Sequence, residues 1–245
     1  AALRVLNRVA REMYPDGFDR SEKKAEIAAF RKSFKASNVE MQTSAAFPMM
    51  PERILSELRD VLPSDAIITT DVGWNKNGVG QQFPIYEPGS IQIPGGYATM
   101  GFGVPAAIGA KIAKPDKIVF DIAGDGSIQM NIQELTTAVF YKIPVKIAIL
   151  NNGFLGMVRQ WQELFYDRRY SGTDLTGNPD FARVAEAYGA VGIKVAEPEQ
   201  VRPAIEQAMA VDDRPTFIDF VVTREENVFP MIPAGKSPDD IMLCQ

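Results

Sequence analysis

The chain has 245 residues, 46% hydrophobic and 23% charged, a composition typical of a folded domain with an ample core. No apolar run reaches about 18 residues, so no membrane span is predicted, and a net charge of −5 without a basic stripe argues against a nucleic-acid partner. The chain contains no histidine, which excludes a Ser-His-Asp triad, Cys-His chemistry and His-ligated zinc within it. A single cysteine, Cys244, and the absence of an opening signal peptide lead us to expect a cytoplasmic protein.

The first 50 residues are typical of the end of a preceding domain followed by an interdomain connection. Residues 1–14 have helical periodicity without a cap, and residues 15–50 are polar and charged, then rich in Ser, Ala and Pro. The charged run 20–32 suits a solvated helix face or a linker. We therefore expect a piece of a longer polypeptide, with a compact domain over 51–230 and a C-terminal tail over 231–245.

From residue 51 onward, helical and strand-like patterns alternate. Pro51 and Glu52 suit the first turn of a helix over 51–61. Further strands are predicted at 66–70, 117–122, 145–150, 192–195 and 216–222, and further helices at 104–113, 127–141, 181–188 and 198–209. This alternation predicts an α/β fold, a mostly parallel sheet with helices on both faces.

The most informative motif is Gly124-Asp125-Gly126 followed by Asn151-Asn152, each at the end of a predicted strand. A crossover helix between the strands makes them parallel, so Asp125 and Asn152 leave from the sheet edge where α/β folds bind ligands. A carboxylate and an amide oxygen can hold one hard cation such as Mg²⁺ against a diphosphate. The glycines allow close approach of an anion, and free N–H groups near Ser127 would face phosphate oxygens. Each half alone is an ordinary turn, but together they predict a cofactor site.

A second motif suggests a different cofactor. Residues 101–106 match the G-x-G-x-x-A pattern of dinucleotide-binding folds, and Asp121 follows at the interval of a ribose-binding acid. However, residues 94–97 (PGGY) do not form a strand pattern before it, and the Gly124 loop follows Asp121 almost at once. These small residues more readily indicate a helix that packs closely.

The residues around the first motif resemble the thiamine diphosphate-binding domain of acetolactate (acetohydroxyacid) synthase large catalytic subunits. The resemblance runs from about residue 51 to the C-terminus and covers only that domain of the family. The matching segments are 69–73 (TTDVG), 98–103 (ATMGFG), 105–110 (PAAIGA), 151–158 (NNGFLGMV), 160–161 (QW), 164–166 (LFY) and 227–233 (NVFPMIP).

The resemblance implies thiamine diphosphate and Mg²⁺ as cofactors, and a role for each matching position. Asp125, the Asn152 side chain and the Phe154 backbone carbonyl would be the metal ligands. The residues implied around the diphosphate are Val72, Gly73, Trp74, Asn75, Gly124, Gly126, Ser127, Leu155 and Gly156.

The resemblance also assigns residues to the rest of the pocket. Met100 would hold the cofactor in its bent shape, and the Ala98 carbonyl would accept a hydrogen bond from its aminopyrimidine. Met157 and Val158 would close the cofactor pocket, and Trp161 would shape the site for a second 2-oxo acid. Without the resemblance, the helical spacing of Met157 and Trp161 would indicate core packing, and Met100 would indicate a gap-filling side chain.

The activity implied is that of a carboligase of branched-chain amino acid biosynthesis, which decarboxylates pyruvate and joins the two-carbon unit to a second 2-oxo acid. In this flavoprotein family the catalytic Glu comes from the N-terminal domain of the same or a partner subunit. No position here matches it, so we expect no catalytic residue in this chain and no activity from it alone. The resemblance also implies assembly into a homodimer or tetramer and a regulatory subunit as a candidate partner, and FAD is expected only in the full-length protein.

One departure keeps alternatives open. The family usually carries Gly-Gln-His where this chain has Gly73-Trp74-Asn75. A sibling decarboxylase, carboligase or cyclic diketone hydrolase, or a non-catalytic cofactor-binding fragment, therefore stays possible as a reading. Gln160-Trp161 and residues 230–233 (PMIP) favour acetolactate chemistry.

Overall fold

The structure, a computed structural model, describes residues 1–243, so Cys244 lies outside the described part. The chain divides into two compact units, Ala1–Glu40 and Met41–Gln245. The second unit begins before residue 51 because Met49 belongs to its core. Met49 is fully buried, its N–H donates to the Val221 carbonyl (3.2 Å), and its carbonyl accepts from Thr223 (2.9 Å).

The first unit is helical. It contains α1 (Ala2–Met13) and most of α2 (Ser21–Gln42), and no residue of α1 is buried. The charged run 20–32 is exposed along α2, as expected of a solvated helix face. The 22-residue α2 occupies much of the stretch expected to be a connection, because its Ala, Lys and Glu residues are strong helix formers.

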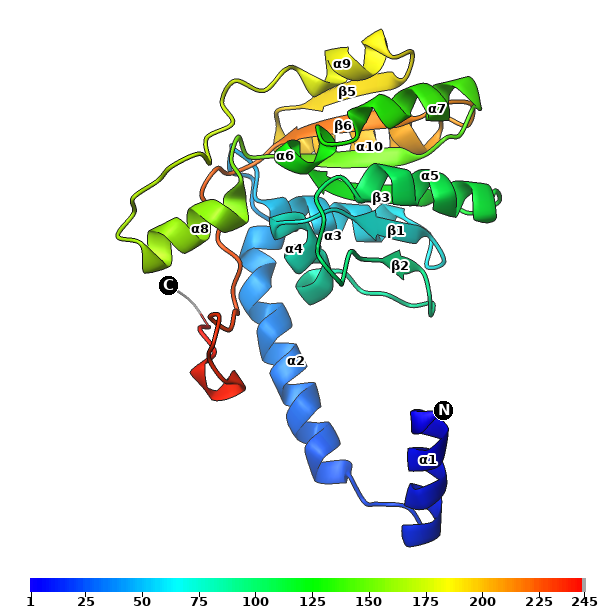
Figure 1. Ribbon diagram of the computed structural model, residues 1–245, viewed down its shortest axis with the longest axis vertical. Helices are drawn as coiled ribbons and strands as arrows, with labels where there is room; N and C mark the ends of the chain where they lie inside the picture. The colour runs from blue at the N-terminus through cyan, green and yellow to red at the C-terminus, as the bar shows by residue number, and fades with distance from the viewer. Residues whose placement is uncertain (244–245) are drawn as a thin grey trace. The chain divides into compact units, whose positions relative to one another are not determined.

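The second unit contains a six-stranded sheet within the described residues, and Figure 1 shows helices packed on it. The strand order is β2-β1-β3-β4-β6-β5, and every neighbouring pair is parallel. The strands are β1 (Ile67–Thr70), β2 (Ile91–Gln92), β3 (Val119–Gly124), β4 (Lys146–Asn151), β5 (Val191–Val195) and β6 (Thr216–Val221). The predicted α/β fold is confirmed.

Helices cover both faces of this sheet. The helices of this unit are α3 (Pro51–Val61), α4 (Trp74–Gln82), α5 (Gly103–Ala113), α6 (Asp125–Ile128), α7 (Leu135–Phe140), α8 (Gly156–Phe165), α9 (Phe181–Ala187) and α10 (Val201–Met209), with short 3₁₀ turns η1 (Ile132–Glu134), η2 (Pro198–Gln200) and η3 (Pro238–Asp240). One buried core joins the sheet to α3, α4 and α10, and the other joins it to α5, α7 and α9. Successive residues of β3 alternate between them, with Phe120 and Ile122 in the first and Val119 and Ala123 in the second.

The structure divides one predicted helix and contains elements that the sequence did not predict, among them β2 and α4. The helix expected over 127–141 is broken into α6, η1 and α7, because Asn131 leaves helical geometry (φ −136°) and its side chain donates to the Gly101 carbonyl (2.8 Å). The sequence did not predict α4, which contains two glycines and two asparagines. Tertiary packing stabilises α4 instead, since Val79 is buried and Asn75 Nδ2 donates to the Ile122 carbonyl (2.7 Å).

None of the helices in the described part of the chain is both long and apolar enough to cross a membrane.

Candidate functional site

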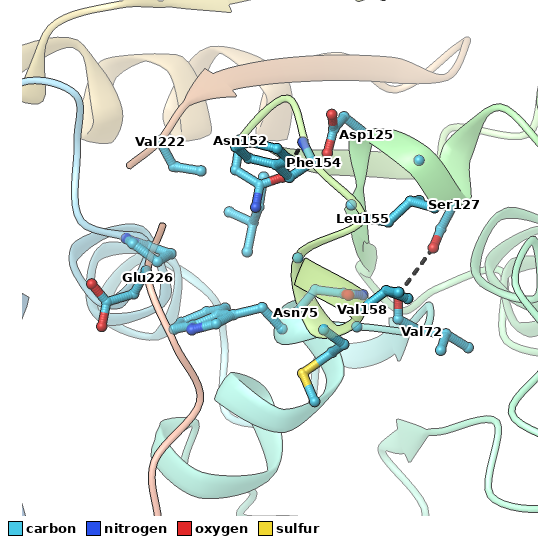
Figure 2. Close-up of a pocket in the computed structure, with 18 of the residues that line it drawn as sticks. Val72, Asn75, Asp125, Ser127, Asn152, Phe154, Leu155, Val158, Val222 and Glu226 are labelled. Carbon is cyan, nitrogen blue, oxygen red and sulfur yellow. Dashed lines mark hydrogen bonds between the residues drawn. The ribbon is translucent and has the colours of Figure 1, made fainter. Parts of the chain in front are cut away.

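A pocket lies at the carboxyl ends of β1, β3 and β4, where α4, α6 and α8 begin (Figure 2). It encloses about 700 Å³, part of which is open to solvent. The residues selected from the sequence that line it are Val72, Gly73, Trp74, Asn75, Met100, Gly124, Asp125, Gly126, Ser127, Asn152, Phe154, Leu155, Gly156, Met157 and Val158. The parallel order β1-β3-β4 thus brings three separate loops together, as the strand-helix-strand pattern predicted for two of them.

Ala98 and Trp161 are not among the lining residues. Ala98 adopts a positive φ of 51° in the loop that leads to Met100. Trp161 lies one turn after Met157 on α8, and 49% of it is exposed. The alternative interpretation from helical spacing, that Trp161 packs in the core, is therefore wrong.

Asp125 is the first residue of α6, and only 1% of its surface is exposed. Its Oδ2 accepts hydrogen bonds from the Gly153 N–H (3.1 Å) and from Asn178 Nδ2 (2.7 Å), whereas Oδ1 accepts neither. Burial raises the pKa of this carboxyl from 3.8 to about 6, and the hydrogen bonds oppose that rise. A cation beside Asp125 would favour the ionised carboxylate, which burial alone disfavours.

Asn152 comes directly after β4, the strand that pairs with β3. Figure 2 shows it at the same end of the pocket as Asp125 and Phe154. Its Oδ1 accepts from the Phe154 N–H (3.1 Å), and the turn between them needs Gly153, whose φ is +65°. Asp125, Asn152 and Phe154 all line this end of the pocket. Carboxylate, amide and carbonyl oxygens, which these residues carry, are the donors that a hard cation prefers. Within residues 1–243, no group of three or more His, Cys, Asp or Glu side chains is placed to hold a metal ion.

Three helices begin at this pocket, and none has a side-chain cap at its first turn. Gly73, Gly124 and Leu155 occupy the capping positions of α4, α6 and α8, and all three line the pocket. The first N–H groups of a helix have no partner within the helix and attract anions. The ends of α4 and α8 in one pocket fit the diphosphate group of a cofactor, and Gly124 and Gly126 beside the single turn of α6 allow its close approach.

Asp71 organises the loops on the other side of the pocket. Its Oδ1 accepts from the N–H groups of Val72 (2.8 Å) and Gly101 (2.9 Å), and its Oδ2 accepts from the Gly103 N–H (2.8 Å). The bonds to Gly101 and Gly103 fix the backbone immediately after Met100. In the sequence, Asp71 belongs to the matching segment 69–73, but no role was predicted for it.

The dinucleotide alternative is wrong. Asp121 has no exposed surface, its Oδ1 accepts from the Thr69 hydroxyl (2.7 Å), and burial raises its pKa to about 8. A Cβ at Gly103 would lie 2.4 Å from Asp121 Oδ1, so this glycine serves close packing of α5 on β3. A buried carboxyl of this kind cannot reach a ribose.

The pocket is also lined by residues that sequence analysis did not assign to the site: Pro51, Leu150, Val222, Thr223 and Glu226. The last three follow β6, which lies beside β4 in the sheet. Burial raises the pKa of Glu226, and it raises that of the neighbouring Glu52 to about 7, with a further contribution from the charge of Glu226. The one sequence signal for these residues was their position at the end of the predicted strand 216–222. The sequence did not show that this strand, β6, pairs with β4, which is what brings residues 222–226 to the pocket.

Residues 71–220 match the model of the C-terminal TPP binding domain of thiamine pyrophosphate enzymes. The chain belongs to this family. The match begins at Asp71 and extends through Phe220 in β6, so it contains the loops after β1, β3 and β4 that line the pocket.

Curated relatives of this TPP-binding domain are acetolactate synthases. The chain is 42% identical over 195 residues to the acetolactate synthase large subunit of Haemophilus influenzae, covering 80% of this chain and 34% of the relative. It is 46% identical over 201 residues to the acetolactate synthase of Mycobacterium bovis, covering 80% and 32%. The chain thus spans about a third of the length of the curated relatives it matches.

A solved structure of a different enzyme is also similar to this TPP-binding domain. It is a thiamine diphosphate-dependent 4-hydroxybenzoylformate decarboxylase of Rhodococcus jostii RHA1, with 36% sequence identity and a TM-score of 0.65. The match covers 71% of this chain and 32% of that chain.

Proposed function

We propose that this chain is the part of an acetolactate synthase large subunit that binds the diphosphate of thiamine diphosphate through a Mg²⁺ ion. The observation that carries the proposal is that Asp125, Asn152 and the uncapped first turns of α4 and α8 line one pocket. Identities of 42% and 46% to acetolactate synthases support the choice within the family.

The metal would be held by Asp125, the side-chain oxygen of Asn152 and the backbone carbonyl of Phe154. These are hard oxygen donors, as Mg²⁺ requires, and the single carboxylate suits a ligand that brings its own negative charge. The fit of the site rests on Oδ1 of Asp125, which accepts neither of the hydrogen bonds that fix Oδ2. Oxygens of the diphosphate and water would complete the shell.

Thiamine diphosphate supplies, when bound, the electron sink that decarboxylation of a 2-oxo acid requires. The residues of this chain bind and orient it. Met100 would support the bent cofactor, in a loop held by the carboxylate of Asp71, and the Ala98 carbonyl would accept from the aminopyrimidine. Met157 and Val158, at the start of α8, would exclude water from the same pocket.

The remaining steps belong to the rest of the protein. In our proposal, the full-length enzyme decarboxylates pyruvate and joins the two-carbon unit to a second 2-oxo acid, with Trp161 beside that second substrate. The catalytic Glu would come from an N-terminal domain of the same or a partner subunit, which makes a homodimer or tetramer the expected assembly. FAD and any regulatory subunit would bind outside this chain.

A decarboxylase is the second candidate, favoured by the 36% identity to the Rhodococcus decarboxylase. Trp74 stands where acetolactate synthases usually have Gln, and its ring fills the space beside Gly78, where a Cβ would lie 2.4 Å from Trp74 Cζ3. Analysis of the products that the full-length protein forms from pyruvate separates the candidates. Acetolactate supports the first, and acetaldehyde alone supports the second.

The binding step is testable with the chain itself by calorimetry. We expect thiamine diphosphate to bind in the presence of Mg²⁺ and to bind much more weakly without it, because the two share the site. Asp125→Ala should abolish this dependence, since it removes the only carboxylate among the proposed ligands. Equal affinity with and without Mg²⁺ would contradict the proposal.

A further inference from the structure

Residues 172–178 run beside the loop that follows β4. The Leu155 N–H donates to the Thr173 carbonyl (2.9 Å), and the Leu175 N–H donates to the Gly153 carbonyl (2.8 Å). These bonds connect the two segments on both sides of Phe154, the proposed carbonyl ligand. We call residues 172–178 the brace segment.

Side chains strengthen the same connection. Phe154 and Asp174 form an isolated antiparallel bridge, and the guanidinium of Arg224 lies 4.2 Å from the centre of the Phe154 ring. Arg224 also pairs with Asp174 (3.2 Å). Leu175 Cδ1 lies close enough to Gly126 that an added Cβ there would be 3.1 Å away. The brace segment therefore contacts both loops that carry the proposed metal ligands.

The last residue of the brace segment reaches the metal ligand itself. Asn178 Nδ2 donates to Asp125 Oδ2 (2.7 Å), the oxygen that also accepts from the Gly153 N–H (3.1 Å). Two donors on one oxygen fix the rotation of the carboxylate. Neither of these donors bonds to Oδ1, the oxygen that our proposal assigns to the cation.

The orientation of the Asn178 amide is set by a third side chain. Gln129 Nε2 donates to Asn178 Oδ1 (2.9 Å) and to the Asp125 carbonyl (2.9 Å). Since Gln129 offers an N–H, the Asn178 oxygen must face it, and the Asn178 amino group must face Asp125. Asp180, which caps α9 by accepting from the Arg183 N–H (3.2 Å), anchors the chain just beyond Asn178.

We propose that Asn178 is a positioning residue that orients the Asp125 carboxylate toward a divalent cation, with Gln129 fixing the Asn178 amide. This role rests on the proposed metal site and adds two residues to it that do not touch the metal. Hydrogen bonds to a ligating carboxylate reduce the rotational freedom it must lose on binding. Removal of such partners from metal sites typically lowers metal affinity about 10–100-fold.

The test uses the fluorescence of Trp74, which lines the pocket and is one of the two tryptophans of the chain. Mg²⁺ is titrated into the chain at a fixed concentration of thiamine diphosphate, and the half-saturating Mg²⁺ concentration is read. Asn178→Ala should raise that concentration about 10–100-fold. Saturating Mg²⁺ should restore the affinity for thiamine diphosphate, because the ligands themselves remain.

Two further variants make the test specific. Gln129 is exposed, so Gln129→Ala should fold normally and should shift the Mg²⁺ titration in the same direction. The matched control is Thr176→Ala in the same brace segment, whose hydroxyl donates to Asp174 (2.6 Å) and not to Asp125. The control should leave the titration unchanged.

The outcomes separate this role from the proposed function. An unchanged Mg²⁺ titration in both Asn178→Ala and Gln129→Ala would overturn the positioning role while the metal site stands. So would an equal shift in Thr176→Ala, or a loss of affinity that excess Mg²⁺ does not restore, because either would indicate general disruption of the brace segment. If the unsubstituted chain shows no dependence on Mg²⁺, the metal site itself fails, and the positioning role fails with it.

Discussion

Replacing Asp121 by Asn should remove a pH dependence from the stability of the domain. Asp121 has no exposed surface, and burial raises its pKa from 3.8 to about 8, with Asp71 adding to the rise. Its Oδ1 accepts from Thr69, while its Oδ2 is buried without a hydrogen-bond partner. Between about pH 4 and pH 8, the folded chain therefore holds a proton that the unfolded chain has released.

The sign and size of the effect follow from this difference in bound protons. Because the pKa of Asp121 is raised on folding, its contribution to the free energy of unfolding is most favourable below about pH 4. This contribution falls steadily as the pH rises to about 8. The loss is about 1.4 kcal/mol in the free energy of unfolding for each pH unit within that window. Asn is neutral at every pH, and its oxygen can still accept from Thr69. The stability of Asp121→Asn minus that of the unsubstituted chain should therefore rise by about 3 kcal/mol from pH 5 to pH 7.

Urea unfolding followed by tryptophan fluorescence at several pH values measures this difference. Taking the difference between the two chains cancels the contributions of other groups with raised pKa, such as Glu52 and Asp125. A difference that stays flat across this range would refute the reasoning, because it would mean that Asp121 is ionised in the folded chain.

Three further substitutions test the packing around the site. Gly126→Ala would place a Cβ 2.7 Å from Leu155 Cδ2, so thermal unfolding should show a loss of about 1–3 kcal/mol, and calorimetry should show weaker thiamine diphosphate binding. Asn75→Ala leaves the buried Ile122 carbonyl without its side-chain donor, and urea titration should show a loss of about 1–3 kcal/mol. Phe217→Ala empties a fully buried position and should cost about 3–5 kcal/mol in the same titration, without changing the Mg²⁺ dependence of cofactor binding. Changes below about 0.5 kcal/mol would contradict each expectation.

The strand-helix-strand unit around Asp125 and Asn152 was predictable because its information is local. The apolar runs at 117–122 and 145–150 are typical of buried strands, and their ends carry polar residues that a core would not accept. Strands β3 and β4 formed where these runs predicted them, shifted by at most two residues at either end.

Other parts of the site depend on contacts that are distant in sequence. The 74–82 segment has poor helix propensity, and α4 forms because Val79 and Asn75 pack against the sheet. Glu226 reaches the pocket only because β6 pairs with β4, and strand order is not encoded in a local pattern. Asn178 looks like an ordinary loop residue until the fold brings it to Asp125, 53 positions earlier.

The sequence by itself determined the alternating α/β architecture and the motif that puts a carboxylate and an amide at one sheet edge, because periodicity and strand ends are local properties. Only the tertiary structure decided that the first turns of α4 and α8 line one pocket with them, that Asp121 is buried in the core, and that Asn178 donates to the Asp125 carboxylate. These facts depend on which strands pair and on which loops pack together. Such arrangements are set by burial and hydrogen bonding across the whole domain.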